Sequence, residues 1–489
     1  MWNEVVYKRW RELAPTFVRI GLSSKGTKEY LDNYAKHLQE YKQTGTEVYI
    51  ISSQVDVVNT PEEMQQYVSK VVDGIEYLIR EKKLTNIKYY CMSNELSITT
   101  WASIIKDNDM PTFKRYHEAF FKEFAKRNLD IKLLASDASP IDYWATIKWC
   151  AENMDEITGI YGGHHYINEH SLTDKSFYGW FYTKNKWAVD IAKSKGKNFI
   201  LGEFGAKQNR IIKLISGQYV DKNEYYDTNQ ESLAGIQVAE AIIAAINAGD
   251  YAMGYWTFMD FPNAEPVGKG ENKWGLTRWN GKDNGTRDPY YAVGLMSRYF
   301  GGGGAIHQTL ASDTLVHVAA IKHNKGPWSI AVISRKDKPI EISLELPVGA
   351  KITFRKYIYD PSNVPQNIFG DLQAPSSELI VKGNKLEDMI EGMSLVVYTS
   401  DYDNIPPKAI KNVQVKYAQD KNEVTWDANT EEDMCYYRVF RSSSPDFTSS
   451  LSTQIASTIA LGYTDELPAE RKYYYKVLAV DRYGNALAK

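Results

Sequence analysis

At 489 residues the chain is longer than one typical hydrophobic core, and we expect two or three domains. Its 43% apolar residues and formal charge of −3 are those of an ordinary globular protein and exclude a broad electrostatic attraction to nucleic acid or to an anionic membrane. No run approaches the roughly 20 apolar residues that a membrane span requires. The three cysteines have neither metal-site spacing nor the even number of a disulfide framework.

Short β-rich runs alternate with helical segments from the start of the chain to about Phe300, which is typical of parallel βα units. The runs are TFVRIGLS, EVYIISSQV, IKYYCMSNE, IKLLASDAS, ITGIYGGHHY, FILGEFGA and YAMGYWTFMDF. They predict a (β/α)₈ TIM barrel, which usually takes about 250 residues. One strand is missing, and the helix-like segment Asn3 to Leu13 stands where the helix after strand one belongs. We expect a chain truncated before that helix; an unusual barrel closure is the alternative.

Two helices of this region have recognisable starts. Thr60, Pro61 and Glu63 form a capping box with proline at the first helical position. Behind it, apolar residues recur at intervals of three and four, as on one face of a helix. Asp288 and Pro289 open a later helix, DPYYAVGLMSRYF, in the same way.

The helical pattern stops at the glycine run GGGG, residues 301–304, and short β-rich runs follow. They predict a small antiparallel β-sandwich over residues 301–403. After the linker-like IPP step, residues 404–489 resemble a fibronectin type III module that ends before its last strand. The predicted domains are therefore a catalytic barrel, 1–300, truncated at its start, the sandwich, 301–403, and this module, 404–489, truncated at its end.

Two carboxylates stand at the ends of predicted strands. With the seven runs numbered as strands two to eight, Glu95 ends strand four and Glu203 ends strand seven. A buried carboxylate is costly unless its charge or its proton is used, and TIM-barrel active sites lie at the carboxyl ends of the strands. Two facing carboxyl groups suit glycoside hydrolysis. For either glutamate alone, a structural salt bridge is the alternative.

The Asn94–Glu95 pair on strand four and Glu203 on strand seven resemble clan A of the glycoside hydrolases. The resemblance implies that Glu95 is the acid/base and Glu203 the nucleophile of a retaining mechanism. It also implies that Asn94 hydrogen-bonds the 2-hydroxyl of the bound sugar. These roles agree with the chemistry, since the nucleophile must stay ionised while its partner starts protonated.

Other positions match the clan one at a time. Arg19 ends strand two, where the clan often has an arginine that keeps the nucleophile ionised; a surface salt bridge is the alternative. His164 and Tyr166 match a His-x-Tyr pattern on strand six, and Tyr166 is expected to donate to the nucleophile. His165 points to the other side of the strand and is either a packed residue or a ligand. We expect neither a metal nor an organic cofactor.

Several tryptophans are candidates for sugar-stacking platforms. Trp256 ends strand eight, where the clan commonly has such a platform, and packing in the core is the alternative. Trp101, Trp274 and Trp279 lie on loops and are equally compatible with outer subsites or plain packing. The loop from Asp260 to Arg287 is long enough to be functional.

Two departures leave the family open within the clan. Leu96 follows the strand-four glutamate where family 5 enzymes usually have proline, and strand three ends Ser52, Ser53, Gln54 without the histidine common there. The barrel-plus-sandwich layout also occurs in family 39 and in some endo-β-1,3-glucanases of the clan.

Together these features predict a retaining β-glycosidase, endo-acting on a polysaccharide or oligosaccharide of β-glucan or mannan type. We expect a monomer that has no nucleic-acid partner and no membrane span. A fibronectin-like spacer is common in secreted polysaccharide-degrading enzymes, so we expect an extracellular or periplasmic location, although the chain begins without a signal-peptide pattern. A carbohydrate-binding protein without turnover and a transglycosylase that uses the same site are the alternatives.

Overall fold

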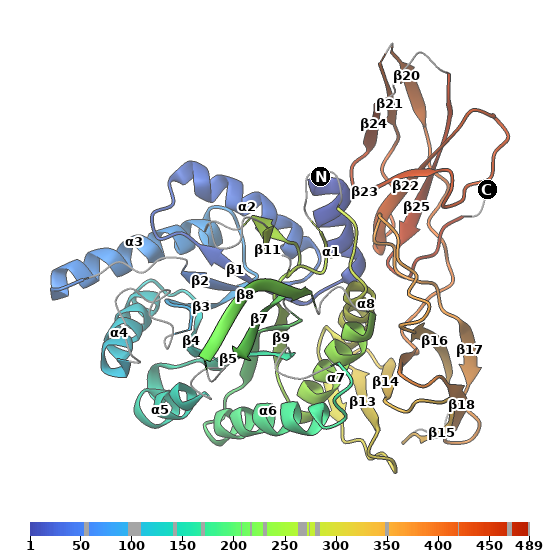
Figure 1. The fold of residues 1–489 in the computed structure, drawn as a ribbon. Helices are drawn as coiled ribbons and strands as arrows, with labels where there is room; N and C mark the ends of the chain where they lie inside the picture. Colours follow the sequence, from blue (N-terminus) through green and yellow to red (C-terminus); the bar gives the residue numbers. More distant parts are fainter. Residues whose placement is uncertain are drawn as a thin grey trace.

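The structure is a computed structural model. It describes residues 1–52, 58–95, 109–139, 144–167, 172–206, 208–215, 218–227, 232–262, 271–272, 274–278, 284–347, 352–418, 420–466 and 472–487, with 208–227, 261–262 and 271–272 described as backbone only. The chain forms a barrel of strands and helices, an antiparallel β-region beside it and a C-terminal pair of small sheets (Figure 1).

Seven parallel strands form the barrel sheet, with helices around its outside (Figure 1). In sheet order the strands are β1 (Phe17–Leu22), β2 (Glu47–Ser52), β3 (Ile87–Cys91), β4 (Lys132–Ala138), β5 (Ile160–Tyr166), β6 (Phe199–Gly205) and β9 (Ala252–Tyr255). The helices are α2 (Lys28–Gln43), α3 (Pro61–Arg80), α4 (Met110–Lys126), α5 (Ala145–Asn153), α6 (Phe177–Ser194), α7 (Ser232–Ala248) and α8 (Pro289–Phe300), with a short η3 (Asp155–Ile157) before β5. The predicted alternation of parallel strands and helices is confirmed.

The sheet is nearly closed. Its end strands, β1 and β9, contact each other, but no ladder of hydrogen bonds joins them among the described residues. The strands between them are almost wholly buried, whereas β1 and β9 are mostly half-buried. Strands covered on both faces carry the long apolar runs that made them recognisable in the sequence.

Helix α3 forms as its sequence predicts. The Thr60 hydroxyl accepts from the Glu63 N–H at 3.1 Å, and the Glu63 carboxylate accepts from the Thr60 N–H at 3.2 Å. This capping box satisfies donors that the first turn leaves unpaired. The helix buries its predicted apolar face, which is made of Tyr67, Val68, Val71, Val72, Ile75 and Leu78.

An antiparallel β-region follows α8. It has a six-stranded sheet, in the order β12 (Gly304–His307), β13 (Val316–His323), β14 (Trp328–Ser334), β19 (Ser394–Thr399), β16 (Thr353–Tyr359) and β17 (Ser377–Ile380), and a pair, β15 (Ile340–Glu345) with β18 (Lys385–Ile390). The large sheet packs on α7 and α8. At Gly235 of α7 a side chain would collide with the Tyr359 ring, whose hydroxyl donates to the Ser232 carbonyl at 2.6 Å. Barrel and sheet thus share one core.

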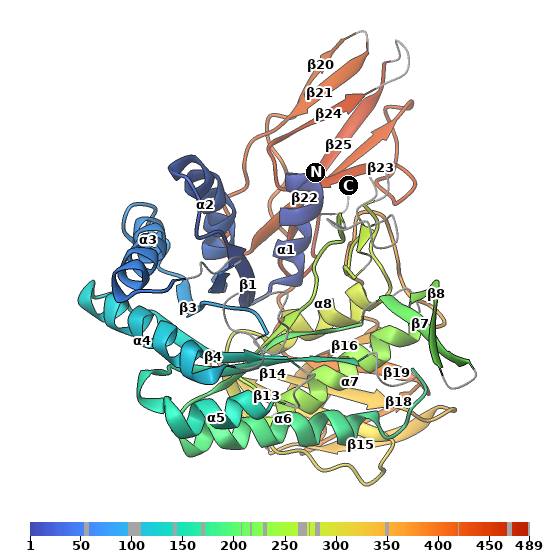
Figure 2. The same cartoon turned by 60° about the vertical axis from the view of Figure 1, so that its left-hand side comes forward.

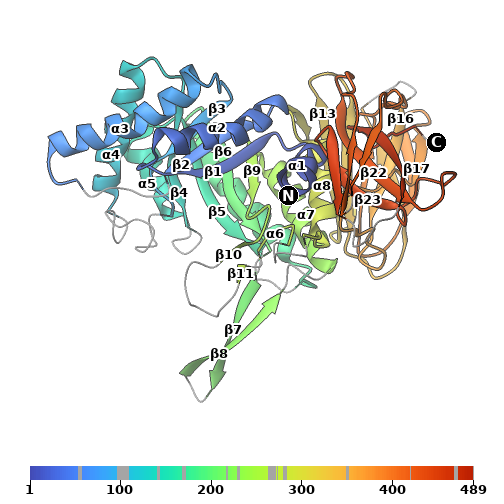
Figure 3. The ribbon, with the colours of Figure 1, turned by 90° about the horizontal axis from the view of Figure 1, so that it is seen from above.

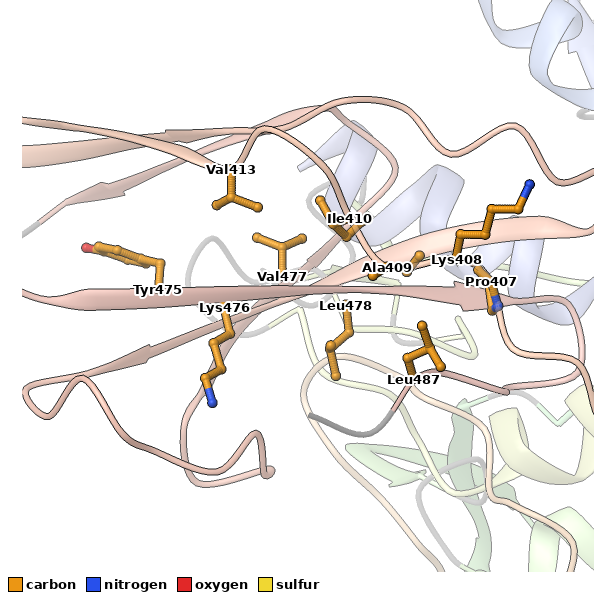
Figure 4. A pocket seen from close by; sticks show the side chains of 11 residues that line it. Pro407, Lys408, Ala409, Ile410, Val413, Tyr475, Lys476, Val477, Leu478 and Leu487 are labelled. Carbon is orange, nitrogen blue, oxygen red and sulfur yellow. The ribbon is translucent and has the colours of Figure 1, made fainter.

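The C-terminal part contains two three-stranded antiparallel sheets. Their orders are β20 (Gln414–Tyr417), β21 (Lys421–Thr425), β24 (Gly462–Glu466) and β23 (Gln454–Thr458), β22 (Met434–Ser442), β25 (Tyr474–Asp481). They enclose a small core with Trp426 edge-on to Tyr437. A groove of about 230 Å³ lies between the 407–413 segment and β25, where Val413 faces Val477 (Figure 4). Two such sheets agree with a β-sandwich; the fibronectin type III assignment stays a prediction.

The N-terminal helices join all three parts. The segment predicted as one helix forms η1 (Trp2–Val6) and α1 (Tyr7–Leu13), which lie beside α8, β22 and β23 (Figure 2). Lys8 is fully buried, and its amine contacts Asp371 of the second part at 2.6 Å. Arg438 of the third part contacts the same carboxylate at 3.2 Å. The C-terminal sheets are therefore docked on the other two parts, an arrangement unlike an extended spacer.

A long hairpin, β7 (Gln208–Ile215) with β8 (Gln218–Asp227), leaves the barrel directly after β6 and projects from it (Figure 3). The sequence analysis did not predict it. Two short paired segments, β10 (Phe261–Pro262) and β11 (Glu271–Asn272), lie in the loop after β9.

Within the described parts of the chain, no helix has both the length and the hydropathy to cross a bilayer.

Candidate active site

Side chains from five barrel strands, or from just after them, meet at the carboxyl end of the barrel. Arg19 is on β1, Asp137 on β4, His164 and Tyr166 on β5, and Glu203 on β6, while Asn94 and Glu95 follow β3. Parallel strands place such residues at one end of the barrel, which explains how distant segments form one cluster. Six of the ten site residues predicted from the sequence are in this cluster, and Asp137 is added to them.

Glu203 is surrounded by cationic and hydrogen-bonding side chains. An Arg19 guanidinium nitrogen lies 2.7 Å from Glu203 Oε1, and the Tyr166 hydroxyl donates to Oε2. His164 Nδ1 lies 3.6 Å from Oε2. Burial acts to raise the pKa of Glu203, but the charges of His164 and Arg19 and the Tyr166 hydrogen bond outweigh it and lower that pKa. The surroundings hold this carboxyl group ionised.

Glu95, unlike Glu203, does not lie on a β-strand. Strand β3 ends at Cys91, so Glu95 lies four residues beyond the strand rather than at its end, which corrects the sequence-based placement. Its φ of +42° lies in the left-handed region, and its N–H donates to the Asp137 carbonyl at 3.2 Å. Its Oε1 lies 2.7 Å from His164 Nδ1. One carboxylate oxygen of Glu95 and one of Glu203 lie within 4.8 Å of each other.

Asp137 is the residue that the sequence analysis missed. It is fully buried, accepts from Arg19 at 2.6 Å and lies 3.1 Å from His164 Nε2. Burial opposes its ionisation, yet Arg19 and His164 hold the pKa of its carboxyl group well below the usual range. Its signal was present in IKLLASDAS, an apolar run that ends in a carboxylate just as the runs before Glu95 and Glu203 do.

His164 connects the three carboxylates. Its Nδ1 faces Glu95 and Glu203, and its Nε2 faces Asp137. Burial alone would lower the pKa of this imidazole, but Glu203 and Asp137 raise it to about 10. His164 is therefore an imidazolium at neutral pH, with both nitrogens donating.

Glu95, His164 and Glu203 also offer three potential ligand atoms within 4.8 Å of one another, a spacing that a metal ion would accept. An imidazolium has no lone pair to give to a metal, because ligation requires the neutral ring. Arg19 adds a second positive charge beside Glu203. The surroundings of these residues thus disfavour a cation.

Asn94 and His165 occupy different environments. The Asn94 side-chain oxygen accepts from Arg19, so the cation that contacts Glu203 also orients this amide. His165 points away from the cluster, as alternation along the strand requires. Its ring stacks on Phe181 at 4.5 Å and lies 4.3 Å from Trp180. The structure therefore resolves the two interpretations of His165 in favour of a packed residue.

The four predicted tryptophans separate into two groups. Trp256 follows β9 directly, is half-buried, and donates from its backbone N–H to the Phe204 carbonyl at 2.8 Å. The Trp274 carbonyl accepts from the Thr257 N–H at 3.3 Å, so Trp274 lies against the end of the same strand. Trp101 and Trp279 fall outside the described residues. Backbone hydrogen bonds thus place Trp256 against Phe204 of β6, the residue after Glu203, and Trp274 against Thr257, the residue that follows Trp256.

A buried ion pair holds the loop that carries Trp274. Arg287 contacts both oxygens of Asp260 at 2.8 Å and donates to the Gly275 carbonyl at 2.6 Å. The Gly275 N–H donates to Asp260 at 2.9 Å. The two ends of the long loop after β9 are therefore joined by a bidentate pair, the strongest common geometry for such a contact.

Comparisons with known proteins were made for both sequence and structure. No family model and no curated protein matches the sequence. Among solved structures, the chain is similar to a glycoside hydrolase family 30 subfamily 8 xylanase from Clostridium acetobutylicum, with 12% identity, a TM-score of 0.57, and coverage of 81% of this chain and 93% of that one. The chain shares its fold.

Two further structures have the same architecture. A family 51 arabinofuranosidase from Xanthomonas axonopodis pv. citri is 12% identical, with a TM-score of 0.52 and coverage of 81% and 89%. A family 39 glycoside hydrolase from Bacteroides cellulosilyticus is 11% identical, with a TM-score of 0.52 and coverage of 80% and 76%. Family 39 is one of the families whose layout the sequence suggested. At such low identity the similarity establishes the fold, and function must be argued from the site.

Proposed function

We propose that this protein is a retaining glycoside hydrolase, with Glu203 as nucleophile and Glu95 as acid/base. The observation that supports this most is the pair of buried carboxylates, one just after β3 and one on β6, of which only Glu203 contacts both an arginine and a tyrosine hydroxyl. Two carboxyl groups of unlike surroundings are what general acid and nucleophile require. The solved glycoside hydrolases of the same fold agree with the assignment.

The spacing of the carboxylates favours retention. Oxygens of Glu95 and Glu203 approach within 4.8 Å. Retaining enzymes keep their two carboxyl groups about 5–5.5 Å apart, whereas inverting enzymes need about 6.5–9.5 Å to admit a water molecule between carboxylate and sugar. A gap this short leaves room for direct attack on the anomeric carbon and little room for that water.

The reaction then takes two steps. Protonated Glu95 gives its proton to the glycosidic oxygen while the Glu203 carboxylate bonds to the anomeric carbon, and the leaving sugar departs as an alcohol. The ionised Glu95 next removes a proton from water, which attacks the anomeric carbon and releases Glu203. Throughout, Arg19 and Tyr166 stabilise the Glu203 oxygens. We propose that Asn94, which accepts a hydrogen bond from the same Arg19, binds the 2-hydroxyl.

We further propose a β-linked polysaccharide or oligosaccharide as substrate and an extracellular or periplasmic setting. β-Glucan and mannan are the sequence-based candidates, and the similar xylanase and arabinofuranosidase add xylan and arabinofuranosides to the panel to be tested. Trp256 and Trp274, whose backbones lie at the end of β9, are the aromatic side chains that we propose to stack on a sugar ring.

The decisive experiment is hydrolysis by Glu95→Ala and Glu203→Ala. We expect each variant to lose aryl β-glycoside hydrolysis by orders of magnitude, because each lacks a group that acts in the transition state. Azide should rescue both, giving a β-glycosyl azide with Glu95→Ala and an α-glycosyl azide with Glu203→Ala, because the small anion replaces a different carboxylate in each.

Glu123→Gln is the matched control, since Glu123 is also a buried glutamate paired with an arginine but lies on α4. Near-normal turnover in both active-site variants would contradict the assignment. A wild-type protein that binds oligosaccharides without turnover would support the binding-protein alternative. Glycosylated acceptors in place of free sugar would support transglycosylation by the same residues.

A further inference from the structure

We propose that Asp137 is a positioning residue of this site, and that its carboxylate holds Arg19 and His164 where they contact Glu203 and Glu95. The inference rests on the proposed function and adds to it a residue that the two-carboxylate mechanism does not require. Asp137 lies deeper than the two glutamates: it is 0% exposed, against 8% for Glu95 and 6% for Glu203.

The contacts of Asp137 reach both catalytic glutamates through separate partners. One oxygen accepts from Arg19 at 2.6 Å, and the same guanidinium donates to Glu203 at 2.7 Å. The other oxygen faces His164 Nε2 at 3.1 Å, while Nδ1 of that ring lies 2.7 Å from Glu95. The backbone carbonyl of Asp137 also accepts from the Glu95 N–H at 3.2 Å. One residue is thus connected to both halves of the site.

Gly202 leaves the space that this arrangement needs. A Cβ at position 202, next to the nucleophile, would lie 3.1 Å from an Asp137 oxygen and 3.2 Å from His164 Nε2. Contacts this short force neighbouring atoms to move. The absence of a side chain at Gly202 therefore allows the aspartate and the imidazole to meet directly behind Glu203.

Charge explains why an aspartate is needed. Arg19 and His164 are two cations around one cluster, and Asp137 is the anion between them. Among the described residues, Glu203 is a further anion that faces this aspartate, and it is already paired with Arg19. Tyr49 on β2 and Cys91 on β3 also face it; burial raises the pKa of both, so they remain neutral and cannot replace its charge. Without Asp137, His164 would lose the hydrogen-bond acceptor at Nε2. Arg19 would lose one of the three side chains that accept its hydrogen bonds.

Substitution by asparagine removes the charge and keeps the shape. For Asp137→Asn we expect kcat/KM to fall about 100-fold, mainly in kcat, because a displacement of about 1 Å in a catalytic group has that effect. The pKa of His164, now about 10, should fall into the range of pH 6–8. A new basic limb in the pH–rate profile should follow, since His164 would become neutral within the working range.

Asp371→Asn is the matched control. Asp371 is likewise a buried aspartate between two cations, Lys8 and Arg438, but it lies at the junction of the three parts of the chain. Both variants should lower thermal stability, and only Asp137→Asn should change the pH–rate profile. Gly202→Ala is a second test, because it retains every charge and separates Asp137 from His164; it should shift the profile in the same direction by a smaller amount.

NMR of the imidazole ring provides a readout that is independent of turnover. In the wild-type protein His164, assigned by its absence in His164→Gln, should carry protons on both nitrogens at pH 7.5. A neutral His164 in the wild type would overturn the proposal. So would a folded Asp137→Asn protein with an unchanged pH–rate profile. If His164 responds to Asp137 as expected but the wild type hydrolyses no glycoside, the proposed function fails and the positioning role stands.

Discussion

Charge balance governs the residues at the centre of the barrel. Three buried carboxylates, Glu95, Asp137 and Glu203, face two cations, Arg19 and His164. Buried charges are tolerated only when they are paired and hydrogen-bonded, and removing one partner leaves an uncompensated charge. An apolar core would stabilise the barrel better than this cluster of buried charged groups does. Under the proposed function, this position at the carboxyl ends of the strands is that of an active site.

Tyr166→Phe tests the support of the nucleophile. The variant removes a hydrogen bond to an ionised group, worth about 1.5–3 kcal/mol, so kcat/KM should fall roughly 10- to 100-fold. The pKa of Glu203 is lowered partly by this hydroxyl. Without it that pKa rises, a higher pH is needed to ionise Glu203, and the acidic limb of the pH–rate profile should move to higher pH.

The control is Tyr251→Phe, because the Tyr251 hydroxyl contacts Glu47 at the opposite end of the barrel. It should leave the profile unchanged. An acidic limb that stays in place in Tyr166→Phe, or that moves to lower pH, would contradict the role given to the tyrosine.

At the scale of elements, a buried ion pair holds the loop after β9. Asp260 and Arg287 delimit this loop, which the sequence showed to be long enough for a functional role, and they form a bidentate pair. The pair positions Gly275 and, next to it, Trp274. A platform tryptophan needs such a support, because an unsupported loop would have to be ordered each time substrate binds.

Arg287→Lys tests this support. Lysine keeps the charge but cannot form the two parallel hydrogen bonds of the guanidinium. We expect KM for a polysaccharide to rise about tenfold while kcat for a small aryl glycoside changes little, on the proposal that Trp274 forms an outer subsite that the small substrate does not fill. Steady-state kinetics on both substrates measure the difference. Arg11→Lys, in a partly exposed pair with Glu40, is the control; equal effects on both substrates in Arg287→Lys would contradict the assignment.

Elements differed in how well the sequence predicted them. Helix α3 was evident from a capping box and an apolar face, which are local signals. The end of β3 was placed four residues too late, because Met92 and Ser93 extend the apolar and small-residue pattern although the backbone has left the ladder. The β7–β8 hairpin was not predicted, because its strands mix polar and apolar residues, although the Ser-Gly dipeptide between them in the sequence is a turn signal.

For the whole molecule, the interface around α1 joins parts far apart in sequence. Lys8, Asp371 and Arg438 come from three separate regions and form one buried ion-pair network. Lys8 also pairs with Glu12 and donates to the Phe369 carbonyl at 2.9 Å. Such a network fixes the relative orientation of the parts, since a buried charge without its partner is strongly destabilising.

Asp371→Asn measures what this interface contributes. Burial acts to raise the pKa of Asp371, but Lys8 and Arg438 lower it from 3.8 to about 2. A depressed pKa in the folded state adds stability that is present above the unfolded value and is lost as the pH falls toward the folded value. At pH 7 the variant should therefore lose on the order of 2 kcal/mol, and its difference from wild type should shrink between pH 4 and 3.

Thermal unfolding across that pH range gives the comparison. Asp313→Asn is the control, since Asp313 forms an exposed pair with Lys336 that is expected to contribute little. A stability difference between Asp371→Asn and wild type that does not change with pH would show that the carboxylate is not held ionised by its neighbours.

The sequence by itself determined the barrel, its succession of strands and helices, the β-rich region after Phe300, and six residues that the structure gathers in one cluster. Local signals predicted the fold and the two glutamates: apolar period, capping residues, and carboxylates at the ends of apolar runs. The other four residues, Asn94, Arg19, His164 and Tyr166, were expected from the resemblance to clan A. Asp137 also ends an apolar run, but it matches no position of the clan A pattern. Its role became apparent only from the structure, in which Arg19 and His164 lie on either side of it.

Only the tertiary structure decided the contacts between residues far apart in the chain. Distances between Glu95 and Glu203, the direction in which His165 points and the docking of α1 onto Asp371 and Arg438 depend on packing of segments that share no local pattern. A pKa depends on the same contacts, because burial and neighbouring charges are properties of the assembled barrel. The sequence therefore indicated which chemistry to expect, and the fold decided which residues support it.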